Sequence, residues 1–337
     1  MTSARPLTVA VTGPSGTFGF GLLPLLQADE RIGQVVGIAR RPFDPAEQGW
    51  TKLAYRQGDV RDPGALEMAF AGADVVVHLA FQITGTASRA TIRAINVDGT
   101  INAFRAARSA GASRFVWASS VAAYGFHADN PIGMSEDWPV RPASRLFYAR
   151  EKAELELLLE QEAEEHPDVG LYRLRPSVVL GPHALGGKQL VPGPLASLVR
   201  PSTHFLGRLP VPLPAFVPAV PLQFVHEHDV GLALLLCVVG AGPPGAYNIA
   251  GDGNLTLTDV ARELGLAAWP LPASWAHGPA RLAARLPRLP LTPPAAEWVE
   301  ALTHPSIMDT AKAKRELGWR PRYSGLEALQ ETIRPAR

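Results

Sequence analysis

Three glycines near the start of the chain constrain the fold more than any other feature of the sequence. The apolar run Leu7–Val11 leads into a glycine-rich loop at Thr12–Gly19, and a helical pattern follows at Phe20–Gln27. In such a loop the first glycine allows a tight turn, the second lets backbone amides approach a pyrophosphate, and the third lets helix and strand pack closely. The helix N-terminus also offers N–H groups and a favourable dipole to phosphates. The spacing predicts a dinucleotide site that includes Gly13, Gly16 and Gly19.

The rest of the first half alternates short β-branched runs with helical patterns. Apolar runs bounded by turn residues indicate strands, and apolar residues with a period near 3.6 indicate helices. Strand–helix alternation at this spacing implies right-handed βαβ units and a parallel sheet covered on both faces. We expect further strands at Val35–Ala39, Ala54–Gln57, Val75–Leu79, Arg114–Ala118 and Tyr172–Val179, and helices at Gly64–Phe70, Ala90–Ala110 and Phe147–Glu165.

The composition changes after Gly181 and Pro182. Residues 182–222 and 266–296 are rich in proline, whereas the stretch between them returns to strands and helices. We therefore predict an α/β fold, a Rossmann-like doubly wound parallel sheet with a smaller, interleaved C-terminal substrate lobe. The nucleotide-binding domain would span residues 1–181, with 223–250 returning to it, and the lobe would comprise 182–222 and 251–337. The later elements expected are strands at Phe224–His226 and Tyr247–Ile249 and helices at Asp229–Val239, Thr256–Leu264 and Asp309–Leu317.

Charge and composition argue against several classes of partner. The 337 residues are 47% hydrophobic and carry a net charge of +1, so there is no basic field to attract nucleic acid or an anionic membrane. The longest apolar run, Leu232–Val239, is too short to span a bilayer, and we expect no secretory signal. With Cys237 as the only cysteine, no intramolecular disulfide can form. We expect a cytoplasmic protein with a small-molecule substrate that binds neither nucleic acid nor membrane.

The end of the second expected strand bears on the choice of nucleotide. Enzymes that use NAD usually place Asp or Glu about twenty residues after the glycine loop, against the ribose. Here the strand ends in Ala39, Arg40 and Arg41. A carboxylate would repel a 2′-phosphate, whereas a guanidinium binds it through charge-assisted hydrogen bonds. The sequence favours NADP(H) over NAD(H); the alternative is that the arginines are solvated and that Asp44 reaches the ribose.

A tyrosine and a lysine one helical turn apart form the candidate catalytic pair. Tyr148 and Lys152 stand at i and i+4 of the expected helix Phe147–Glu165, so their side chains can converge. The ammonium would lower the pKa of the phenol, and Tyr148 could then exchange a proton with a substrate oxygen near neutral pH. Ser120 follows the strand Arg114–Ala118 at the sheet edge where open α/β proteins bind ligands, and its hydroxyl could hydrogen-bond the reacting oxygen. We predict a centre for hydride chemistry; the alternative is an ordinary helix pair beside a turn serine.

Further short motifs follow in a fixed order along nearly the whole chain. They are Gly58-Asp59-Val60, His78-Leu79-Ala80, Asn96-Val97-x-Gly99-Thr100, Ser119-Ser120-x-x-x-Tyr124-Gly125, Tyr148-x-x-x-Lys152, Arg175-Pro176-x-x-x-x-Gly181-Pro182, Phe224-Val225-His226-x-x-Asp229-Val230, Tyr247-Asn248-Ile249 and Glu316-Leu317-Gly318-Trp319. With these motifs the chain resembles the extended branch of the short-chain dehydrogenase/reductase superfamily, the NAD-dependent epimerase/dehydratase family. The resemblance implies a Rossmann-like sheet with a C-terminal substrate lobe, and a homodimer formed through the helices Ala90–Ala110 and Phe147–Glu165.

The resemblance also implies roles for individual residues. Ser120 matches the family's catalytic serine, and Tyr148 and Lys152 match its acid/base pair. Asp59 and Val60 would lie by the adenine, and Asn96 would support the lysine or the cofactor. Leu79, Ala80 and Phe81 would line the cofactor path, although the family often has a second alanine where Phe81 stands. The complete predicted cofactor-binding set is Gly13, Ser15, Gly16, Thr17, Phe18, Gly19, Arg40, Arg41, Asp59, Val60, Leu79, Ala80, Phe81, Asn96, Ser119, Tyr148, Lys152, Pro176 and Val178.

A cluster of metal-ligand residue types occurs at His226–Asp229. It falls on the junction between an expected strand and an expected helix. We therefore interpret Asp229 as a helix cap and predict no metal site.

Departures from the family pattern bear on the substrate. Sugar-nucleotide members have an asparagine that holds the substrate diphosphate where this chain has Val178. The preceding Arg175-Pro176 resembles members that act on flavonoid, steroid-like and other non-sugar carbonyls or alcohols. Residues 190–222 are apolar with few charges, which suits an apolar ligand. The Asp-Glu pair of the sugar dehydratases does not follow Ser120.

These departures favour an NADP(H)-dependent carbonyl reductase or alcohol dehydrogenase that acts on a hydrophobic, non-nucleotide small molecule. One alternative is an NAD-dependent sugar or nucleotide-sugar epimerase/dehydratase, which would use the same Ser120, Tyr148 and Lys152. A second alternative is a non-catalytic NAD(P)-binding sensor, and the intact catalytic set argues against it.

Overall fold

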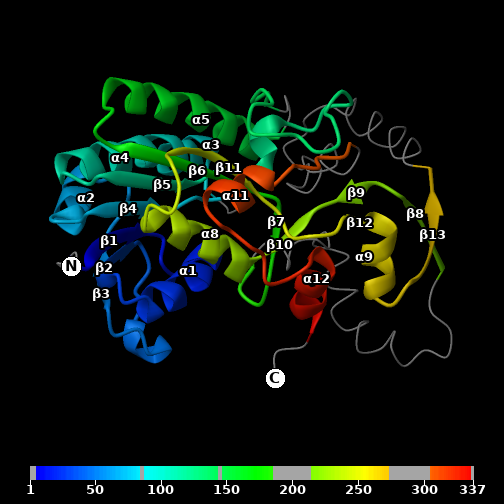
Figure 1. The fold of residues 1–337 in the computed structure, drawn as a ribbon, viewed down its shortest axis with the longest axis horizontal. Helices are drawn as coiled ribbons and strands as arrows, with labels where there is room; N and C mark the ends of the chain where they lie inside the picture. The colour runs from blue at the N-terminus through cyan, green and yellow to red at the C-terminus, as the bar shows by residue number, and fades with distance from the viewer. Residues whose placement is uncertain (1–4, 84–86, 143–145, 185–213, 273–303, 335–337) are drawn as a thin grey trace.

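Seven parallel strands form the central sheet of the protein, in the order β11-β6-β5-β4-β1-β2-β3 (Figure 1). The computed structural model describes residues 5–83, 87–142, 146–184, 214–272 and 304–334. This order is that of a doubly wound Rossmann sheet, extended by one strand beyond β6. The predicted fold class is confirmed. The strands are β1 (Leu7–Thr12), β2 (Ile32–Ala39), β3 (Leu53–Gln57), β4 (Val75–His78), β5 (Arg114–Ala118), β6 (Gly170–Pro176) and β11 (Gly245–Ile249).

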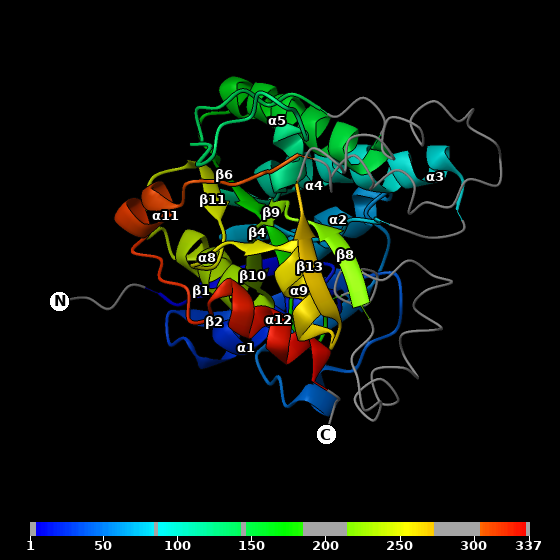
Figure 2. The same ribbon diagram turned by 90° about the vertical axis from the view of Figure 1, so that its right-hand side faces the viewer.

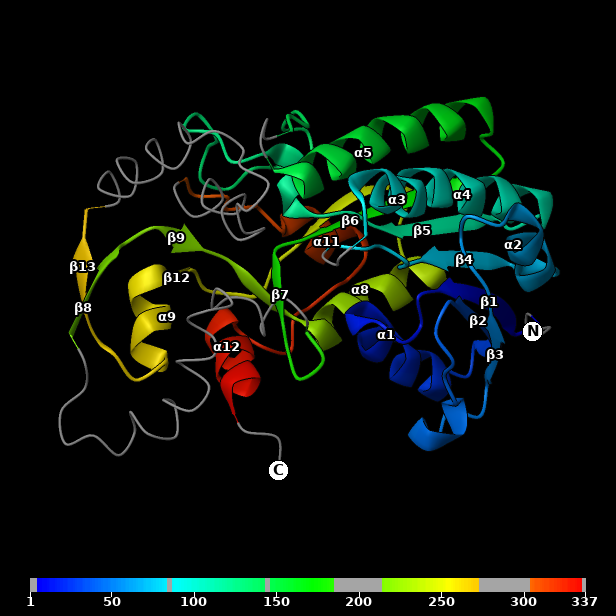
Figure 3. The same ribbon diagram turned by 180° about the vertical axis from the view of Figure 1, so that it is seen from behind.

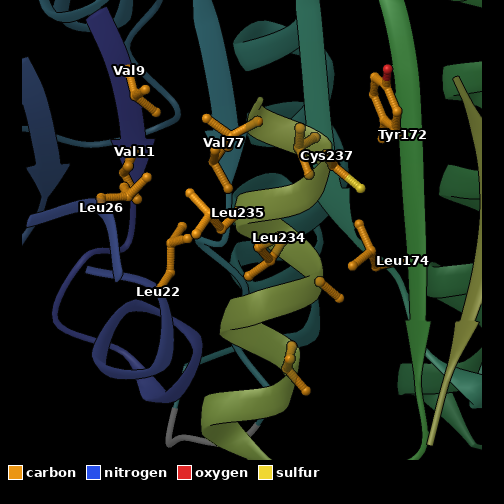
Figure 4. Close-up of a cluster of buried hydrophobic side chains, with 14 of the residues drawn as sticks. Val9, Val11, Leu22, Leu26, Val77, Tyr172, Leu174, Leu234, Leu235 and Cys237 are labelled. Atoms are coloured by element: carbon orange, nitrogen blue, oxygen red, sulfur yellow. The ribbon is translucent and has the colours of Figure 1, made fainter. Parts of the chain in front are cut away.

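Helices cover both faces of the sheet (Figures 1 and 3). Val9 and Val11 of β1 pack in one apolar cluster with Leu22 of α1 and Leu234 of α8, as Figure 4 shows. Ala10 points the other way, into a second cluster with residues of α2, α4 and α5. Because parallel strands covered on both faces are apolar at nearly every position, the central strands β1 and β4 appear in the sequence as nearly continuous apolar runs. The helices are α1 (Thr17–Ala28), α8 (Glu227–Val238) and α11 (Ala311–Glu316) on one face, and α2 (Pro63–Phe70), α4 (Gly99–Ser109) and α5 (Phe147–Glu165) on the other.

A smaller lobe lies beyond the carboxyl ends of the strands (Figures 1 and 2). Three strand pairs build its described part, and a small apolar cluster joins Leu180 and Phe224 to Val260 and Leu329. The pairs are β7 (Val178–Leu180) with β10 (Phe224–His226), β9 (Pro221–Leu222) with β12 (Leu255–Thr256), and β8 (Pro214–Pro218) with β13 (Ala267–Leu271); the helices are α9 (Leu257–Glu263) and α12 (Gly325–Ile333).

Two predicted elements are interrupted in the structure. The expected helix at 90–110 consists of α3 (Arg89–Arg93) and α4, joined by a π-helical turn at Ala94–Asp98. The expected strand at 172–179 breaks at Ser177, whose N–H donates to the carbonyl of Ile249, and continues as β7, which pairs with β10 outside the main sheet. The break at Ser177 falls at the carboxyl end of β6, and the chain beyond it enters the lobe.

The chain returns to the sheet near its end. Ala313, Leu317 and Trp319 belong to the apolar cluster on one face of the sheet, so part of the range 251–337 packs on the half of the protein that contains the central sheet. Trp319 also donates from its indole Nε1 to the carbonyl of Asp229 (2.9 Å). Among the helices in the described ranges, none has the length and apolar content needed to cross a membrane.

Candidate active site

Two glycines of the loop between β1 and α1 stand where the surrounding backbone leaves no room for a Cβ atom. Gly13 has a φ of +69°, which favours glycine, and a Cβ there would lie 3.0 Å from the backbone of Ala80. A Cβ at Gly19 would lie 2.0 Å from the carbonyl oxygen of Pro14, so only glycine fits. Gly16 is the N-cap of α1, and no side chain caps this helix in the described structure. The start of this helix therefore has the position and the dipole that favour an anion.

The loop fits the pyrophosphate of a dinucleotide. Its close backbone packing, its uncapped helix and its position at the carboxyl edge of a parallel sheet are the three features that such a group requires. The hydroxyl of Thr17 donates to the carbonyl of His183 (2.9 Å), which connects the start of α1 to the segment after β7.

The arginines after β2 are exposed. The Arg40 guanidinium donates to Oε1 of Gln82 (3.2 Å), and the carbonyl of Arg41 accepts from the hydroxyl of Tyr55. The carboxylate of Asp44 accepts from the N–H of Ala46 and caps a short helical turn. The structure therefore shows cationic side chains at the end of β2 and gives the carboxylate of Asp44 a local structural partner.

A buried polar chain holds the end of β1 against β4. The hydroxyl of Thr12 accepts from the N–H groups of Leu79 and Ala80 (3.1 Å each) and bonds to Nδ1 of His78 (2.9 Å). Nε2 of His78 reaches the hydroxyl of Thr100 (3.0 Å). Burial, with a smaller contribution from the charge of Lys152, lowers the pKa of His78 to about 3, so the ring is neutral. This chain fixes the backbone of the predicted cofactor path.

The predicted adenine residues lie at the end of β3. Asp59 forms a two-point ion pair with Arg61, and that contact lowers the pKa of the Asp59 carboxyl. Val60 is buried against Gly99 at the start of α4. The described structure therefore places Asp59 at the surface and Val60 in the core.

The structure brings Ser120, Tyr148 and Lys152 together at the end of β5. The side chains of Ser120 and Tyr148 are hydrogen-bonded to each other, and the Oγ of Ser120 also accepts from the N–H of Ala122 (3.1 Å). Nζ of Lys152 donates to the carbonyl of Ala118 (2.7 Å) and lies 5.9 Å from the centre of the Tyr148 ring. Lys152 is almost fully buried, with 3% of its surface exposed.

The expected lowering of the Tyr148 pKa is wrong for this structure. Burial raises the pKa of Tyr148 to about 12, and the hydrogen bond with Ser120 offsets only part of this effect. Burial also lowers the pKa of Lys152 to about 7, against the opposing charges of Glu156 and Glu151. Loss of water around both groups therefore outweighs the neighbouring charge on which the sequence argument relied.

Asn96 lies in the π-helical turn and clamps the segment that follows β4. Its Oδ1 accepts from the N–H of Gln82 (2.7 Å), and its Nδ2 donates to the carbonyl of Gln82 (3.0 Å) and to Oε2 of Glu151 (2.7 Å). Burial raises the pKa of Glu151, with the Asn96 hydrogen bond acting in the opposite direction. Gln82, which the sequence reasoning did not single out, thus contacts both Arg40 and Asn96.

A buried ion pair between α5 and β6 lies next to the end of β5. Arg175 donates twice to Glu156, from Nε to Oε1 (2.9 Å) and from Nη2 to Oε2 (3.0 Å). Oε1 of Glu156 also accepts from the hydroxyl of Ser119 (2.6 Å), the neighbour of Ser120. Arg175 further donates to the hydroxyl of Tyr124 (2.6 Å). The sequence reasoning missed Glu156, although its position four residues after Lys152 on α5 is a signal that could have found it.

The end of β6 contributes an apolar surface to the site. Pro176 is buried, whereas Val178 at the start of β7 has 36% of its surface exposed. Because the guanidinium of Arg175 is committed to Glu156 and Tyr124, it is not available to an anionic substrate.

The residues at 226–229 serve structural contacts. His226, not Asp229, is the N-cap of α8, and its Nδ1 accepts from the N–H of His228 (3.1 Å). The carboxylate of Asp229 accepts from the N–H groups of Arg322 and Tyr323 (2.9 and 3.0 Å). The interpretation of Asp229 as the cap is therefore wrong; it fastens the C-terminal segment to α8. No group of three metal-ligand side chains was found in the part of the chain that the structure describes.

Comparisons with known proteins place this geometry in context. The model of the NAD dependent epimerase/dehydratase family matches residues 9–250. An uncharacterised protein of Mycobacterium tuberculosis is 26% identical, over 98% of this chain and 84% of its own length. The structure of UDP-glucose 4-epimerase from Thermotoga maritima, determined with UDP-glucose, is similar with a TM-score of 0.72, 21% identity and coverage of 97% of each chain. That of dTDP-glucose 4,6-dehydratase from Bacillus anthracis, determined with NAD, is similar with a TM-score of 0.70, 16% identity and coverage of 97% of this chain and 95% of that one.

Proposed function

Because the chain belongs to the NAD dependent epimerase/dehydratase family, we propose that Ser120, Tyr148 and Lys152 are the catalytic centre through which this NAD(P)-dependent enzyme interconverts a secondary alcohol and its ketone. The observation that carries the proposal is the hydrogen bond between Ser120 and Tyr148 at the carboxyl edge of β5, with Lys152 buried one turn away on α5. A bound nicotinamide cofactor supplies the hydride acceptor or donor. The three side chains lie at the carboxyl edge of the sheet, which is where doubly wound folds bind their ligands.

The protein's own residues divide the remaining work. Ser120 and Tyr148 hold the substrate oxygen through their hydroxyl groups. Tyr148 gives the oxygen a proton when a ketone is reduced and takes one when an alcohol is oxidised, and its raised pKa keeps the proton in place until substrate binds. Lys152 in its protonated form would oppose the effect of burial on Tyr148 and favour release of the proton, although burial dominates in the structure.

Residues at the carboxyl ends of the six strands β1 to β6, together with residues of the π-helical turn between α3 and α4, of α5 and of β7, would hold the cofactor. The backbone at Gly13, Gly16 and Gly19 would hold the pyrophosphate. Arg40 and Arg41 would lie by the adenosine ribose. The rest of the predicted set would complete the site: Ser15, Thr17, Phe18, Asp59, Val60, Leu79, Ala80, Phe81, Asn96, Ser119, Tyr148, Lys152, Pro176 and Val178.

The first candidate reaction is epimerisation of a sugar or nucleotide sugar with a retained NAD. Its support is that the similar structures with stated activities act on nucleotide sugars, and that one of them was determined with NAD. The test is to release the nucleotide from purified protein, identify it by chromatography, and incubate the protein with UDP-glucose. This candidate predicts bound NAD and formation of the C4 epimer. Protein that carries no NAD and leaves UDP-glucose unchanged would count against it.

A second candidate, an NADP(H)-dependent carbonyl reductase for a hydrophobic substrate, has its own observation. Val178 offers an exposed apolar surface at the position where the sugar-nucleotide enzymes that the chain resembles have an asparagine. The guanidinium of Arg175 is paired with Glu156 and cannot replace that asparagine. Calorimetry with NADPH and NADH decides between the candidates. A preference for NADPH that falls about tenfold in Arg40→Ala, but not in the control Arg56→Ala on β3, supports the reductase. Equal binding of the two nucleotides contradicts it.

A further inference from the structure

Aromatic rings surround the ammonium group of Lys152. Its Nζ lies 3.6 Å from the centre of the Phe81 ring, 4.8 Å from that of Trp117 and 5.9 Å from that of Tyr148. The ammonium has three N–H donors, and one of them donates to the carbonyl of Ala118 (2.7 Å). Ring faces attract a cation, and the attraction grows when water is excluded, as it is here.

Both of the closest rings have contacts besides that with Lys152. Trp117 lies on β5 with 1% of its surface exposed. Phe81 packs edge-on against Tyr148, with 5.7 Å between ring centres, and its neighbour Gln82 is fixed by two hydrogen bonds to Asn96. The ring of Phe81 is therefore placed by the backbone clamp and does not depend on Lys152 for its position.

We propose that Phe81 is a positioning residue for Lys152: its ring, with that of Trp117, encloses the ammonium, holds it on the Ala118 carbonyl and keeps water away from it. The inference rests on the proposed function, because it concerns the lysine of the catalytic centre. An alanine in place of Phe81 could neither face the cation nor close the space around it.

The ring has two opposing effects on the pKa of Lys152. Its face stabilises the ammonium, which raises the pKa, whereas its bulk excludes water, which lowers it. The other titratable groups around Lys152 are Tyr148, Glu151 and Glu156 on α5 and His78 on β4, with Arg175 on β6 paired to Glu156. Burial dominates and lowers the pKa to about 7. Substitutions at Phe81 can separate the two effects.

The test is an NMR titration of the whole protein labelled with ¹³C-lysine and free of nucleotide and substrate. The chain has five lysines, so the Lys152 signal can be assigned from its loss in Lys152→Met. Phe81→Leu keeps bulk but removes the ring face, and the pKa of Lys152 should fall by about one pH unit. Phe81→Ala admits water, and the pKa should rise towards the usual value of about 10.4. Phe81→Tyr keeps both effects and should resemble the wild type.

The control is Ile83→Ala, an exposed residue two positions along, which should leave the titration unchanged. Thermal unfolding of each variant checks that the fold is intact. If Phe81→Ala does not fold, the titrations of Phe81→Leu and Phe81→Tyr still test the effect of the ring on Lys152. Equal titration of Lys152 in wild type, Phe81→Leu and Phe81→Tyr would overturn the proposal. So would a fall in the pKa in Phe81→Ala. Because the titration needs no turnover, a failed catalytic proposal leaves its outcome unaffected and the two can be told apart.

Discussion

The two ends of the candidate site depend on different physical interactions. At the β1–α1 turn, backbone geometry decides the structure: Gly13 and Gly19 stand where a Cβ would collide with other backbone atoms. At the β5–α5 end, buried charge decides it: Lys152, Glu156 and Arg175 are nearly inaccessible to water. The first end can be recognised from spacing along the chain, whereas the second depends on partners that folding brings together.

The comparison predicts its largest effect on stability at the charged end. Glu156→Ala leaves Arg175 buried without its carboxylate, and loss of one partner of a buried pair costs about 3–5 kcal/mol. The free energy of unfolding from urea denaturation measures this. The matched control is Glu160→Ala, which removes a carboxylate that is half exposed in its ion pair with Arg173 and should cost about 1 kcal/mol or less. Equal losses of unfolding free energy in the two variants would show that burial does not determine how much the Glu156–Arg175 pair stabilises the fold.

Glu156 also predicts a dependence of stability on pH. Burial raises the pKa of Glu156, but the charges and hydrogen bonds of Arg175 outweigh it, so the pKa lies below its usual value. The stability from Glu156 is therefore present above the unfolded-state pKa of about 4.3 and is lost as the pH falls through the lower folded-state value. The difference in unfolding free energy between wild type and Glu156→Gln should shrink across this acid range. A difference that stays constant there would contradict the assignment.

The next expected effect on stability is smaller and comes from the glycines of the β1–α1 turn. Gly19→Ala forces the loop away from the Pro14 carbonyl, which should cost about 1–3 kcal/mol of stability and abolish measurable NAD(P) binding. Gly49→Ala is the control: its φ of +68° makes alanine unfavourable by about 1–2 kcal/mol, but no atom lies within 4 Å of the new Cβ. Calorimetry should find nucleotide binding kept in Gly49→Ala. Binding retained in Gly19→Ala would show that the loop tolerates a side chain and that its glycines do not define the site.

The same contrast explains how far the sequence alone could predict the molecule. The strands β1, β2, β4 and β5 were predictable because each contains a largely apolar run. Tyr148 and Lys152 were predictable because their spacing fixes a shared helix face. Helix α12 was missed even though Ser324 and Glu327 form a capping box at its start, a signal present in the sequence. The break at Ser177 depends on a hydrogen bond to Ile249, which only the paired strands create.

Electrostatic properties were the hardest to foresee. The expected direction of the Tyr148 pKa was wrong because the argument weighed the charge of Lys152 and not the burial of the phenol. The importance of Glu156 likewise follows from its contact with Arg175, on the neighbouring strand β6. The roles assigned to the predicted site residues stay predictions, and the catalytic set is the part of them that can be tested most directly.

The measurement that tests the central claim is turnover by Tyr148→Phe beside the wild type, with nucleotide affinity measured in both. Conversion of UDP-glucose and reduction of hydrophobic ketones with NADPH cover the two candidate reactions. Removal of the phenol hydroxyl takes away the proposed acid/base and leaves the ring, so we expect a loss of about 10²–10⁴-fold in rate with nucleotide affinity unchanged. Turnover by Tyr148→Phe at the wild-type rate would contradict the assignment of Tyr148 and, with it, the proposed catalytic centre.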